Sequence, residues 1–540
     1  MKKLPLGIQN FREIIEDNHV YVDKTMFVHQ LITSGKSYFL SRPRRFGKSL
    51  LLDTIAEVFK GSKDLFKGLW ISGTDYDFKS YPVIKLDVSS IDNETPDIFK
   101  HSLSEELRYC FEQEDISLSE DTPTGLFKKL IRGLSNKYNQ KVVVLIDEYD
   151  KPILDHIAKT ETAVANRMII RDFYGILKPL DSYIKFIFFT GVSKFTKTSV
   201  FSSLNNLSDI TMIEKYANIC GIPVDDLQVY FGDRIKSLAV HKNFKEYPSL
   251  SDLILKWYDG YSWDGKTKLL NPFGLLSFFQ AEQFKSFWYV SGSPTFLIDL
   301  IKSKPECVPK LGNLTISETD LDAIDIQNLE VGSLLFQTGY LTVSKTIPPD
   351  AELGVPSSYL LEIPNTEVKD AFFNQLTAGL TENEQIFTTS TFREIRKSLR
   401  AGDLQGIRNT LKSLFSSIPY QLHIDSEAYY HSIFFSVMNV LGFKIDAEVS
   451  VSKGRIDAVL ELGEKVYVFE FKHVKCPPEV DDDEKRKISD KALELGMKQI
   501  SDRGYADKYA GSGKTVYLAA FAFLGRDYIE MLSEIDHNSI

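Results

Sequence analysis

The chain has 540 residues, of which 43% are hydrophobic and 26% charged, and its formal net charge at pH 7 is −10. At about 100–200 residues per domain, this length predicts three or four domains. Ordinary glycine and proline counts (31 and 20) exclude collagen-like and low-complexity proteins, and 12% aromatic residues argue against wholesale disorder. The acidic balance gives no global electrostatic signature of nucleic-acid binding, so any such role must depend on a local basic surface.

Neither export nor insertion into a membrane is predicted. Residues 1–11 reach Pro5 and Gly7 before any apolar stretch of signal-peptide length develops. The longest apolar run, Val516–Leu524, is about half the length that crosses a bilayer and is typical of a buried strand. The four cysteines are scattered without a C-x-x-C pair, so we expect no disulfide framework, no structural zinc site and a cytoplasmic location.

The order of apolar runs predicts an α/β protein with four parts. We expect residues 1–221 to form one domain, residues 222–345 a mostly helical accessory region, and residues 346–424 a helical connector that starts with a turn-rich stretch. Residues 425–540 are expected to form a separate domain with the order helix, strand, strand, helix, strand. In the first domain, strand-like runs alternate with helix-length segments, which is typical of a parallel sheet covered by helices. These runs are Ser37–Leu40, Val83–Val88, Val142–Ile146 and Ile184–Phe189.

A phosphate-binding loop is predicted after the first of these strands. The segment Ser41–Ser49 ends in Gly-Lys-Ser, and a helix-like stretch follows it. In such a loop, backbone N–H groups at the helix start hold phosphate, Lys48 contacts the β- and γ-phosphates, and Ser49 binds Mg²⁺. Arg42 occupies the first glycine position of G-x-x-x-x-G-K-S. We therefore expect the loop to turn there without positive φ, or to turn differently.

The residues downstream favour nucleotide binding over a chance match. A chance match is illustrated by Gly513-Lys514-Thr515, which leads into a strand-like run instead of a helix. The run Val142–Ile146, in contrast, ends in Asp147 and Glu148. Asp147 can hold the Mg²⁺ shell, and Glu148 can orient or deprotonate the attacking water. The run Val83–Val88 lies between the two motifs in the sequence and fits P-loop ATPases that insert one strand there.

Two polar residues, Thr190 and Ser193, follow the buried run that ends at Phe189. They would lie beside the γ-phosphate if their strand neighbours the strand of Asp147. A turn at the end of the strand is the better explanation of a threonine and a serine there.

The N-terminal part of the chain resembles the AAA-ATPase-like proteins that are widespread in bacteria. The resemblance covers about the first 300 residues and implies a P-loop ATPase fold with ATP as the ligand. On this basis we expect Arg45, Gly47, Lys48, Ser49 and Asp147 to bind the nucleotide and its Mg²⁺. An arginine is usual in that family at the position of Arg42. The segments that carry the resemblance are Tyr21–Thr25, Arg42–Ser49, Asp147–Asp150, Trp257–Tyr261 and Asn271–Phe273.

A second group of charged residues lies in a predicted β-hairpin near the C-terminus. Two strand-like runs flank Gly463-Glu464, and a glycine at the first central position suits a type II′ turn. Pairing Leu462 with Lys465 and counting outward places Asp457 opposite Glu470, where like charges about 5 Å apart are unfavourable. A divalent cation such as Mg²⁺ or Mn²⁺ would compensate. Lys472 shares this face, where it can stabilise an attacking hydroxide or a phosphorane-like transition state.

A charge network without metal explains the same residues. In it, Asp457 pairs diagonally with Lys472, and Glu470 pairs with Arg455. Burial favours the metal site, because apolar residues share the acidic face and burying an ionic cluster for structure alone is rarely advantageous. The nearby acidic run 479–484 is expected to be a solvated loop and not a metal site.

The hairpin also resembles the PD-(D/E)XK nuclease superfamily, a domain often fused to this ATPase-like module. The resemblance rests on Gly454–Asp457 and on Glu470-Phe471-Lys472, with the two acids thirteen positions apart. It implies a restriction-endonuclease-like α/β fold, with Asp457 and Glu470 as metal-binding catalytic acids and Lys472 as the catalytic lysine. Glu427 matches an acid that the superfamily often places on its first helix, as a further metal ligand, and Gln499 matches a polar residue on the helix after the core strands. Ile456 stands where the superfamily's name has proline.

Two hypotheses of function follow. The first is an ATP-regulated, metal-dependent nuclease that cleaves phosphodiester bonds in nucleic acid, with DNA favoured over RNA and catalysis by Asp457, Glu470 and Lys472, while Glu148 serves ATP hydrolysis. The second is a nucleotide-dependent switch or scaffold whose nuclease-like domain binds nucleic acid or protein without cutting. The complete set of two acids and a lysine favours the first, and the acidic net charge motivates the second. Association with a membrane is not expected, and a homo-oligomer is left open.

Overall fold

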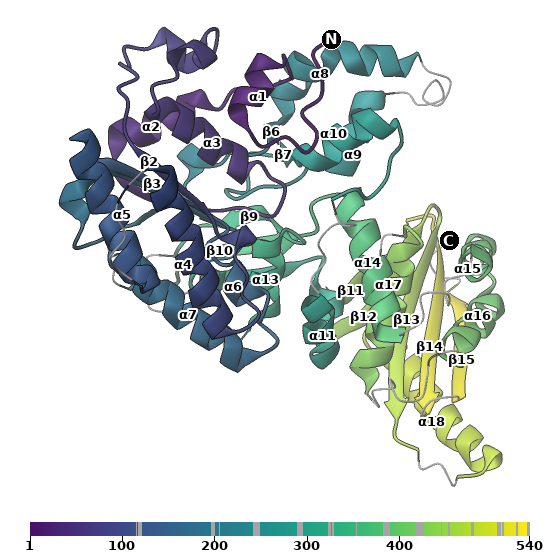
Figure 1. Ribbon diagram of the computed structural model, residues 1–540. Coiled ribbons are helices and arrows are strands. Elements are labelled where there is room, and N and C mark those ends of the chain that lie inside the picture. The colour runs from purple at the N-terminus through teal and green to yellow at the C-terminus, as the bar shows by residue number, and fades with distance from the viewer. Residues whose placement is uncertain are drawn as a thin grey trace. The chain divides into compact units, whose positions relative to one another are not determined.

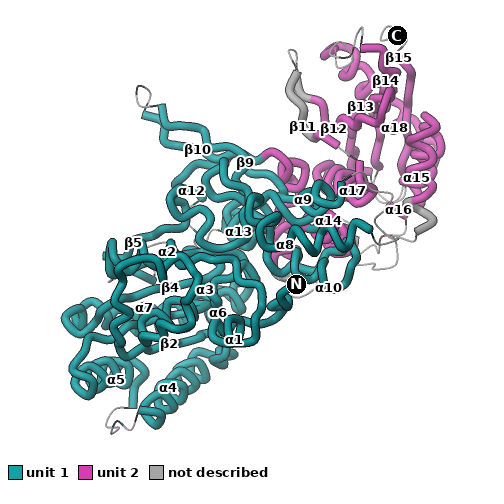
Figure 2. Tube along the Cα trace, turned by 90° about the horizontal axis from the view of Figure 1, so that it is seen from above, with its two compact units in different colours: residues 1–291, 314–367 teal, residues 292–313, 368–540 magenta. Residues whose placement is uncertain are grey.

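The computed structural model divides into two compact units. Unit 1 comprises Met1–Ser291 and Leu314–Glu367, and unit 2 comprises Gly292–Asn313 and Val368–Ile540 (Figure 2). The four-part division at residues 221, 345 and 424 stays a prediction. The structure describes all residues except 115, 117–120, 196–199, 203, 205, 241–248, 289–294, 322–323, 325, 327–328, 351, 353, 382–388, 417, 419–425, 444, 452–453, 477–479, 505–508, 510–511, 525–527 and 537–540, and only the backbone of 295–296, 381, 389–392, 447–451 and 454–455.

Unit 1 is built on a parallel five-stranded sheet with the order β2-β3-β4-β1-β5. The sheet and its first four strands confirm the predicted α/β architecture. Strands β1 and β3 are buried along their whole length, which accounts for their unbroken apolar sequences. Strand β4 separates them in space, while β2 lies at the edge of the sheet. The strands are β1 (Ser37–Ser41), β2 (Val83–Asp87), β3 (Val142–Asp147), β4 (Ile184–Gly191) and β5 (Ser208–Asp209).

Helices surround this sheet, and α4, α5 and α7 pack against one another beside it (Figure 1). Two of them begin with the same local signal, a threonine followed by proline. The side chains of Thr95 and Thr122 accept hydrogen bonds from the backbone N–H groups of Ile98 and Gly125, which caps α4 and α5. The helices are α1 (Phe11–Glu16), α2 (Thr25–Ser34), α3 (Lys48–Phe59), α4 (Pro96–Gln113), α5 (Pro123–Tyr138), α6 (Lys151–Leu154) and α7 (Thr160–Gly175).

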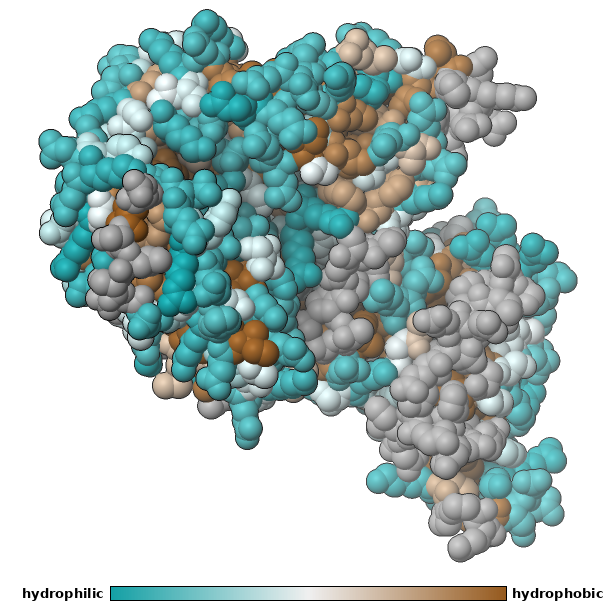
Figure 3. Space-filling view, viewed as in Figure 1, coloured by the Kyte–Doolittle hydropathy of each residue, from teal (hydrophilic) through white to brown (hydrophobic). Residues whose placement is uncertain are grey.

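The rest of unit 1 combines helices with two small sheets. Helices α8 (Val224–Ala239), α9 (Leu250–Tyr258) and α10 (Pro272–Ala281) share one apolar core with the short pair β6 (Ile222–Pro223) and β7 (Leu269–Leu270). Hydrophobic side chains gather on the surface over α9 and α10 (Figure 3).

An antiparallel sheet with the order β8-β10-β9 was not predicted. Strands β9 (Thr342–Ile347) and β10 (Ser358–Glu362) lie on either side of the turn-rich stretch, which therefore joins two strands and does not introduce a purely helical connector. Their burial is mixed, so their apolar pattern is weak. The remaining elements here are β8 (Leu314–Ser317), α12 (Glu318–Leu321) and α13 (Val331–Thr338).

Unit 2 contains a mixed sheet with the order β11-β12-β13-β14-β15, in which β13 and β14 are parallel and the other neighbours antiparallel. The predicted C-terminal order is confirmed, with β11 and β15 in addition. Its strands are β11 (Ile445–Val451), β12 (Gly454–Leu462), β13 (Lys465–Val474), β14 (Thr515–Leu524) and β15 (Tyr528–Asp536). Its helices are α11 (Thr295–Ser303), α14 (Thr366–Thr381, which starts in unit 1), α15 (Thr389–Ala401), α16 (Leu404–Ser416), α17 (Glu427–Val440) and α18 (Asp482–Asp502).

The remaining features of the fold are a second Gly-Lys-Thr segment, the length of the helices and several short 3₁₀ helices. Gly513-Lys514-Thr515 leads into β14, so it is confirmed as a chance match to the phosphate-binding motif. Within the residues that the structure describes, no helix is both long and apolar enough to cross a membrane. Short 3₁₀ helices are η1 (Lys63–Phe66), η2 (Trp70–Gly73), η3 (Val88–Ser90), η4 (Asp181–Tyr183), η5 (Glu214–Tyr216) and η7 (Pro305–Lys310).

Candidate functional site

The loop between β1 and α3 turns at two residues with positive φ. Arg45 has φ of 63° and Gly47 has φ of 95°, whereas Arg42 is not among the described residues with positive φ. The expectation that the loop turns without positive φ at Arg42 is therefore confirmed. A Cβ atom placed on Gly47 would meet nothing within 4 Å, so the space above the start of α3 is open. Ser49, half-buried, is the second residue of that helix.

Arg42 supports the loop from inside. Its side chain is only 1% exposed and donates hydrogen bonds to the carbonyl oxygens of Ser41 (2.8 Å), Thr211 (3.0 Å) and Tyr216 (3.3 Å). Its guanidinium carbon lies 4.0 Å from the centroid of the Trp263 ring. Burial lowers the pKa of Arg42 to about 10. The arginine thus ties the loop to the segment that follows β5, which a glycine could not do.

Lys48 and Glu148 are brought together, as the two motifs predict. The Nζ atom of Lys48 lies 3.0 Å from the carbonyl oxygen of Arg42, 3.2 Å from that of Pro43 and 3.1 Å from Oε1 of Glu148. Glu148 has φ of 49°, and such strain in a non-glycine residue concentrates at functional sites. Burial raises the pKa of Glu148, and the ammonium group of Lys48 opposes this rise.

Asp147 lies at the end of β3 and is 2% exposed. Its Oδ1 atom accepts hydrogen bonds from the hydroxyl group of Thr190 and from the backbone N–H of Glu148. Strands β3 and β4 are neighbours, which was the condition for Thr190 and Ser193 to lie near the predicted phosphate site. Thr190 contacts Asp147 directly, whereas Ser193 contacts Asp150.

Asp150 belongs to the motif at β3, but no role was predicted for it. Its carboxylate is completely buried and accepts hydrogen bonds at 2.6 Å from both the backbone N–H and the hydroxyl group of Ser193, and at 3.2 Å from the backbone N–H of Val192. Burial raises its pKa. A Cβ atom on Gly191 would lie 2.5 Å from Oδ1 of Asp150, so the end of β4 can approach Asp150 this closely only with a glycine there.

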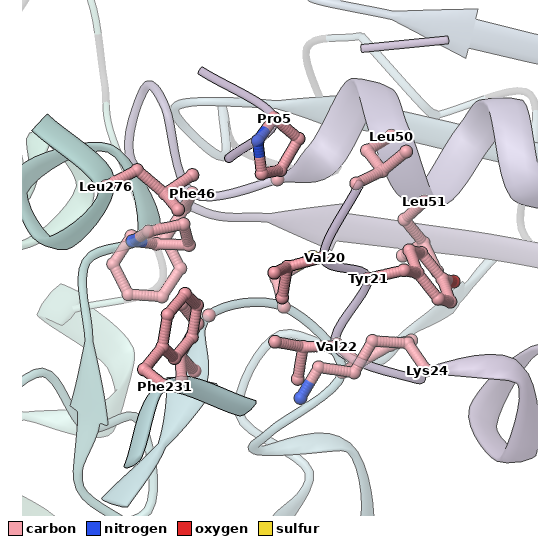
Figure 4. Close-up of a pocket in the computed structure, with 16 residues that line it drawn as sticks. Pro5, Val20, Tyr21, Val22, Lys24, Phe46, Leu50, Leu51, Phe231 and Leu276 are labelled. Carbon is pink, nitrogen blue, oxygen red and sulfur yellow. The ribbon is translucent and has the colours of Figure 1, made fainter. Parts of the chain in front are cut away.

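An apolar cavity of about 100 Å³ lies next to the phosphate-binding loop. Its lining comes from the N-terminal segment, from the loop and α3, and from helices α8 and α10 (Figure 4). Lys24, at one end, donates a hydrogen bond to the carbonyl oxygen of Asn218 (2.9 Å), and burial lowers its pKa to about 8. This cavity was not predicted. Part of the Tyr21–Thr25 motif lines it, but so do residues distant in sequence, such as Cys220 and Phe231, which no local pattern brings together.

The hairpin of unit 2 has the predicted register. Leu462 pairs with Lys465, and the described pairs continue to Ala458 with Phe469. Gly463 has φ of 59°, as the first central position of a type II′ turn requires. The described pairs do not extend to Asp457 and Glu470.

The side chain of Asp457 turns to the backbone of the neighbouring strand. Its Oδ2 atom accepts a hydrogen bond from the N–H of Phe471 at 2.8 Å. Asp457 still raises the pKa of Glu470, which places the two carboxylates within electrostatic range of each other.

Glu470 is completely buried at this site. Its Oε1 atom accepts a hydrogen bond from Nζ of Lys472 at 2.7 Å, while its buried Oε2 atom has no hydrogen-bond partner. Burial, and then the negative charge of Asp457, raise the pKa of Glu470 to about 7. Lys472 therefore pairs with Glu470. The charge network without metal required it to pair with Asp457 instead. The side chain of Arg455, the other partner in that network, lies outside the described residues.

Helix α18 covers the face of the sheet that carries Glu470 and Lys472. A Cβ atom on Gly496 would lie 2.9 Å from Cβ of Ala520 and 3.9 Å from Cγ of Glu470. The helix can therefore come this close to the site only because residue 496 is glycine. Gln499, three residues further along α18, is half-buried.

The remaining predicted residues lie around this centre. Glu427 is the first residue of α17, and its Oε2 atom accepts a hydrogen bond from the N–H of His473 at 3.3 Å. No group of three or more His, Cys, Asp or Glu side chains in the described part of the chain is spaced to hold a metal ion. The acids at 481–484 are exposed to solvent, as expected, but they do not form a loop. Asp481 caps α18 and the next three acids form its first turn, while Glu479 lies outside the described residues.

Comparison with known families agrees with this geometry. Residues 5–201 match the family described as Predicted AAA-ATPase, and residues 425–531 match the PD-(D/E)XK nuclease superfamily. The chain belongs to the AAA-ATPase-like family and carries a C-terminal PD-(D/E)XK domain. This AAA-ATPase-like protein is 36% identical over 531 residues to an uncharacterized protein in the vnfD 5′ region of Azotobacter chroococcum mcd 1. The match covers 97% of the chain and 96% of that protein, so it spans both domains.

The two domains indicate the general chemistry of this AAA-ATPase-like protein. An AAA-ATPase-like domain indicates nucleotide binding, and a PD-(D/E)XK domain indicates nuclease-type chemistry with nucleic acid and a divalent metal. The residues of each site fit these ligands. The open space above Gly47 fits a phosphate at the start of a helix, and the unpartnered buried oxygen of Glu470 fits a hard cation.

Proposed function

We propose that this protein is a metal-dependent nuclease that cleaves DNA and is controlled by ATP. The observation that carries the proposal is the buried Oε2 atom of Glu470, which has no partner although Asp457 and Lys472 adjoin the same carboxylate. Burying a carboxylate oxygen without a hydrogen-bond partner costs free energy, and a cation bound to this oxygen would offset that cost. Carboxylate oxygens are the ligands that Mg²⁺ and Mn²⁺ prefer.

Each residue of the nuclease-like site has a distinct role in this proposal. Asp457 and Glu470 would hold the cation, and the N–H of Phe471 fixes the orientation of Asp457. Lys472 would stabilise negative charge that develops on the scissile phosphate. A bound Mg²⁺ supplies polarisation of the phosphate and a water of lowered pKa. Glu427 would contribute from α17, where it already contacts the backbone of β13.

Unit 1 would bind ATP through its phosphate-binding loop. Lys48 would contact the β- and γ-phosphates, while Ser49 and Asp147 would hold Mg²⁺. Glu148 would orient or deprotonate water for hydrolysis. The contacts of Lys48 with two carbonyl oxygens and with Glu148 hold its ammonium group at the loop, where the phosphates would lie. Arg45, exposed on the loop with its guanidinium group over the ring of Phe273, would contact the nucleotide from outside.

The apolar cavity beside the loop would hold the adenine base. Its lining is apolar, as in most ligand pockets, and Lys24 adds one polar group at its edge.

The proposal is tested by incubating the purified full-length protein with single- and double-stranded DNA and RNA, with Mg²⁺ or Mn²⁺, with and without ATP. Asp457→Ala is expected to reduce cleavage by at least about 100-fold while ATP binding is unchanged. Glu464→Ala, an exposed acid in the turn of the same hairpin, is the matched control and should cleave as the wild type does. Metal-dependent cleavage retained in Asp457→Ala would refute the nuclease assignment.

Control by ATP is tested separately with Lys48→Ala. This variant should lose ATP binding and with it the difference between cleavage with and without ATP. If wild-type cleavage does not change when ATP is added, the nuclease assignment stands but its regulation by ATP is wrong. If no nucleic acid is cut under any metal condition, the protein is better described as a nucleotide-dependent switch or scaffold.

A further inference from the structure

Three consecutive residues of the phosphate-binding loop are held by one later segment of unit 1, residues 257–288. The indole N–H of Trp288 donates a hydrogen bond to the carbonyl oxygen of Arg44 at 2.9 Å. The guanidinium carbon of Arg45 lies 3.9 Å from the centroid of the Phe273 ring. The ring of Phe46 lies 5.1 Å from that of Tyr261. A movement of the loop backbone must therefore move this segment or break these contacts.

The same segment also holds the chain where it leaves unit 1. The backbone N–H of Trp288 donates a hydrogen bond to Oε1 of Glu367 at 2.8 Å. The side-chain amide of Asn365 donates to the carbonyl oxygen of Asp259 at 2.9 Å. A Cβ atom on Gly274 would lie 2.7 Å from Oε2 of Glu367, so this approach depends on glycine. Trp288 thus contacts both the phosphate-binding loop and Glu367.

The chain passes between the units at three places, and Glu367 lies directly at one of them. Glu367 is the last residue of this part of unit 1, and α14 begins at Thr366 and continues into unit 2. Trp288 is the last described residue before a second passage, between residues 291 and 292, and the third lies between residues 313 and 314. A change at the loop that reaches Trp288 therefore also reaches Glu367, where the chain enters unit 2.

Buried polar atoms in this region lack hydrogen-bond partners. They include Oε2 of Glu367, the hydroxyl oxygen of Tyr261, Oδ1 of Asp259 and Nδ2 of Asn271. Native proteins pair nearly all buried polar groups, so such atoms need an explanation. A ligand at the loop can favour a second arrangement of this segment, in which these atoms find hydrogen-bond partners.

We propose that Trp288 and Glu367 transmit the nucleotide state of the phosphate-binding loop to α14, and thereby to unit 2. The inference rests on the proposed binding of ATP and gives its control of unit 2 a structural route. Phosphate bound to the backbone N–H groups of the loop would shift the carbonyl group of Arg44. Trp288 would follow through its indole N–H, and Glu367 would follow through the backbone N–H of Trp288.

The experiment measures hydrogen–deuterium exchange of the peptides of α14 in the full-length protein, at a constant Mg²⁺ concentration, with and without a non-hydrolysable ATP analogue. In the wild type, the analogue is expected to change the exchange rate in α14 by about fivefold or more. Trp288→Phe keeps an aromatic ring but removes the N–H donor, so it should bind the analogue and lose most of this change. Trp70→Phe is the matched control, because Trp70 is 47% exposed on η2.

Two variants of Glu367 provide a second test that does not depend on the folding of Trp288→Phe. Glu367→Gln retains an acceptor for the N–H of Trp288 and should keep the response of α14, whereas Glu367→Ala should lose it. A response of wild-type size in both Trp288→Phe and Glu367→Ala would overturn the relay. A wild-type protein that binds the analogue without any change in α14 would overturn the relay and leave ATP binding intact. Failure of the wild type to bind the analogue would overturn both.

Discussion

Arg42 shows how one residue can replace the feature that a motif normally provides. A phosphate-binding loop usually has glycine at this position, yet here the side chain is buried and its guanidinium group satisfies carbonyl groups of the loop and of residues 211–217. The positive φ that the glycine would adopt occurs at Arg45 instead. Position 42 has therefore become part of the support of the loop.

Arg42→Met should destabilise unit 1 by about 3 kcal/mol, because it leaves several buried carbonyl groups without donors. Urea unfolding followed by tryptophan fluorescence measures the change. Arg44→Met, in the same loop but with an exposed side chain, should alter stability by less than about 0.5 kcal/mol. Equal effects of the two substitutions would contradict the supporting role of Arg42.

Glu470 gives the nuclease-like site a dependence on pH. Its pKa of about 7 lies above the ordinary value of 4.5, so the carboxyl group is mainly protonated at pH 6 and ionised at pH 8 when no metal is bound. A proton competes with a cation for the same oxygen, so metal affinity should fall by up to about tenfold per pH unit below 7. Calorimetric titration of the full-length protein with Mn²⁺ at pH 6, 7 and 8, without nucleotide, checks this.

The matched control for this titration is Glu470→Gln, which should bind Mn²⁺ weakly and without this pH dependence. The raised pKa of Glu470 affects the stability of the metal-free protein in the opposite direction from metal affinity. Because folding favours the protonated form, the metal-free protein should lose stability as the pH rises through 7. Affinity for Mn²⁺ that is the same at pH 6 and pH 8 in the wild type would show that Glu470 is not a ligand.

At the scale of elements, the fold was predictable where burial makes a regular sequence pattern. Strands β1 and β3 are buried on both faces, so their sequences are continuously apolar. The register of β12 and β13 followed from one glycine and the alternation of side chains. The sheet of β8, β9 and β10 was not predictable, since its strands are short and half-exposed. The two-residue strand β5 gives no pattern at all.

The residues of the candidate sites were predictable where they belong to regular, buried sequence patterns, and not elsewhere. Lys48, Asp147 and Glu470 follow or lie in buried strands, so their spacing along the chain determines their place. Asp150 and Glu367 depend on contacts with residues 42 or more positions away, which no local pattern contains.

The packing of α18 on β13 and β14 is the element-level feature on which the nuclease-like site depends. Gly496→Val would place a Cβ atom 2.9 Å from Cβ of Ala520, which is too close, so α18 must move away from Glu470 and Lys472. We expect a loss of about 1–3 kcal/mol in the stability of unit 2 and a large loss of metal-dependent cleavage. Leu495→Val, at an exposed position on the same helix, should change neither. Cleavage by Gly496→Val at the wild-type rate would show that α18 does not support the site.

At the scale of the whole molecule, the acidic net charge of −10 does not prevent contact with nucleic acid. Three acids of the first turn of α18 favour the start of that helix, so part of the charge has a structural role. Helix α15 exposes Arg393, Arg396, Lys397 and Arg400 beside a single acid, Glu394. A local basic surface, which the composition made necessary for any nucleic-acid role, is therefore present in unit 2.

The two proposed ligands should stabilise different units. The phosphate-binding loop and the cavity belong to unit 1, whereas Asp457, Glu470 and Lys472 belong to unit 2. A ligand present at 100 times its dissociation constant stabilises the state that binds it by about 2.7 kcal/mol. Thermal unfolding of the full-length protein should therefore show two transitions. Mn²⁺ alone should raise one of them, and the ATP analogue added at the same Mn²⁺ concentration should raise the other.

Substitutions assign each transition to its unit. Lys48→Ala should abolish the shift caused by the nucleotide and leave the Mn²⁺ shift unchanged, and Asp457→Ala should do the reverse. Differential scanning calorimetry measures both transitions in one experiment. A nucleotide shift that persists in Lys48→Ala would place the nucleotide outside the loop between β1 and α3. A Mn²⁺ shift that persists in Asp457→Ala would remove the metal from the hairpin, and with it the basis for cleavage.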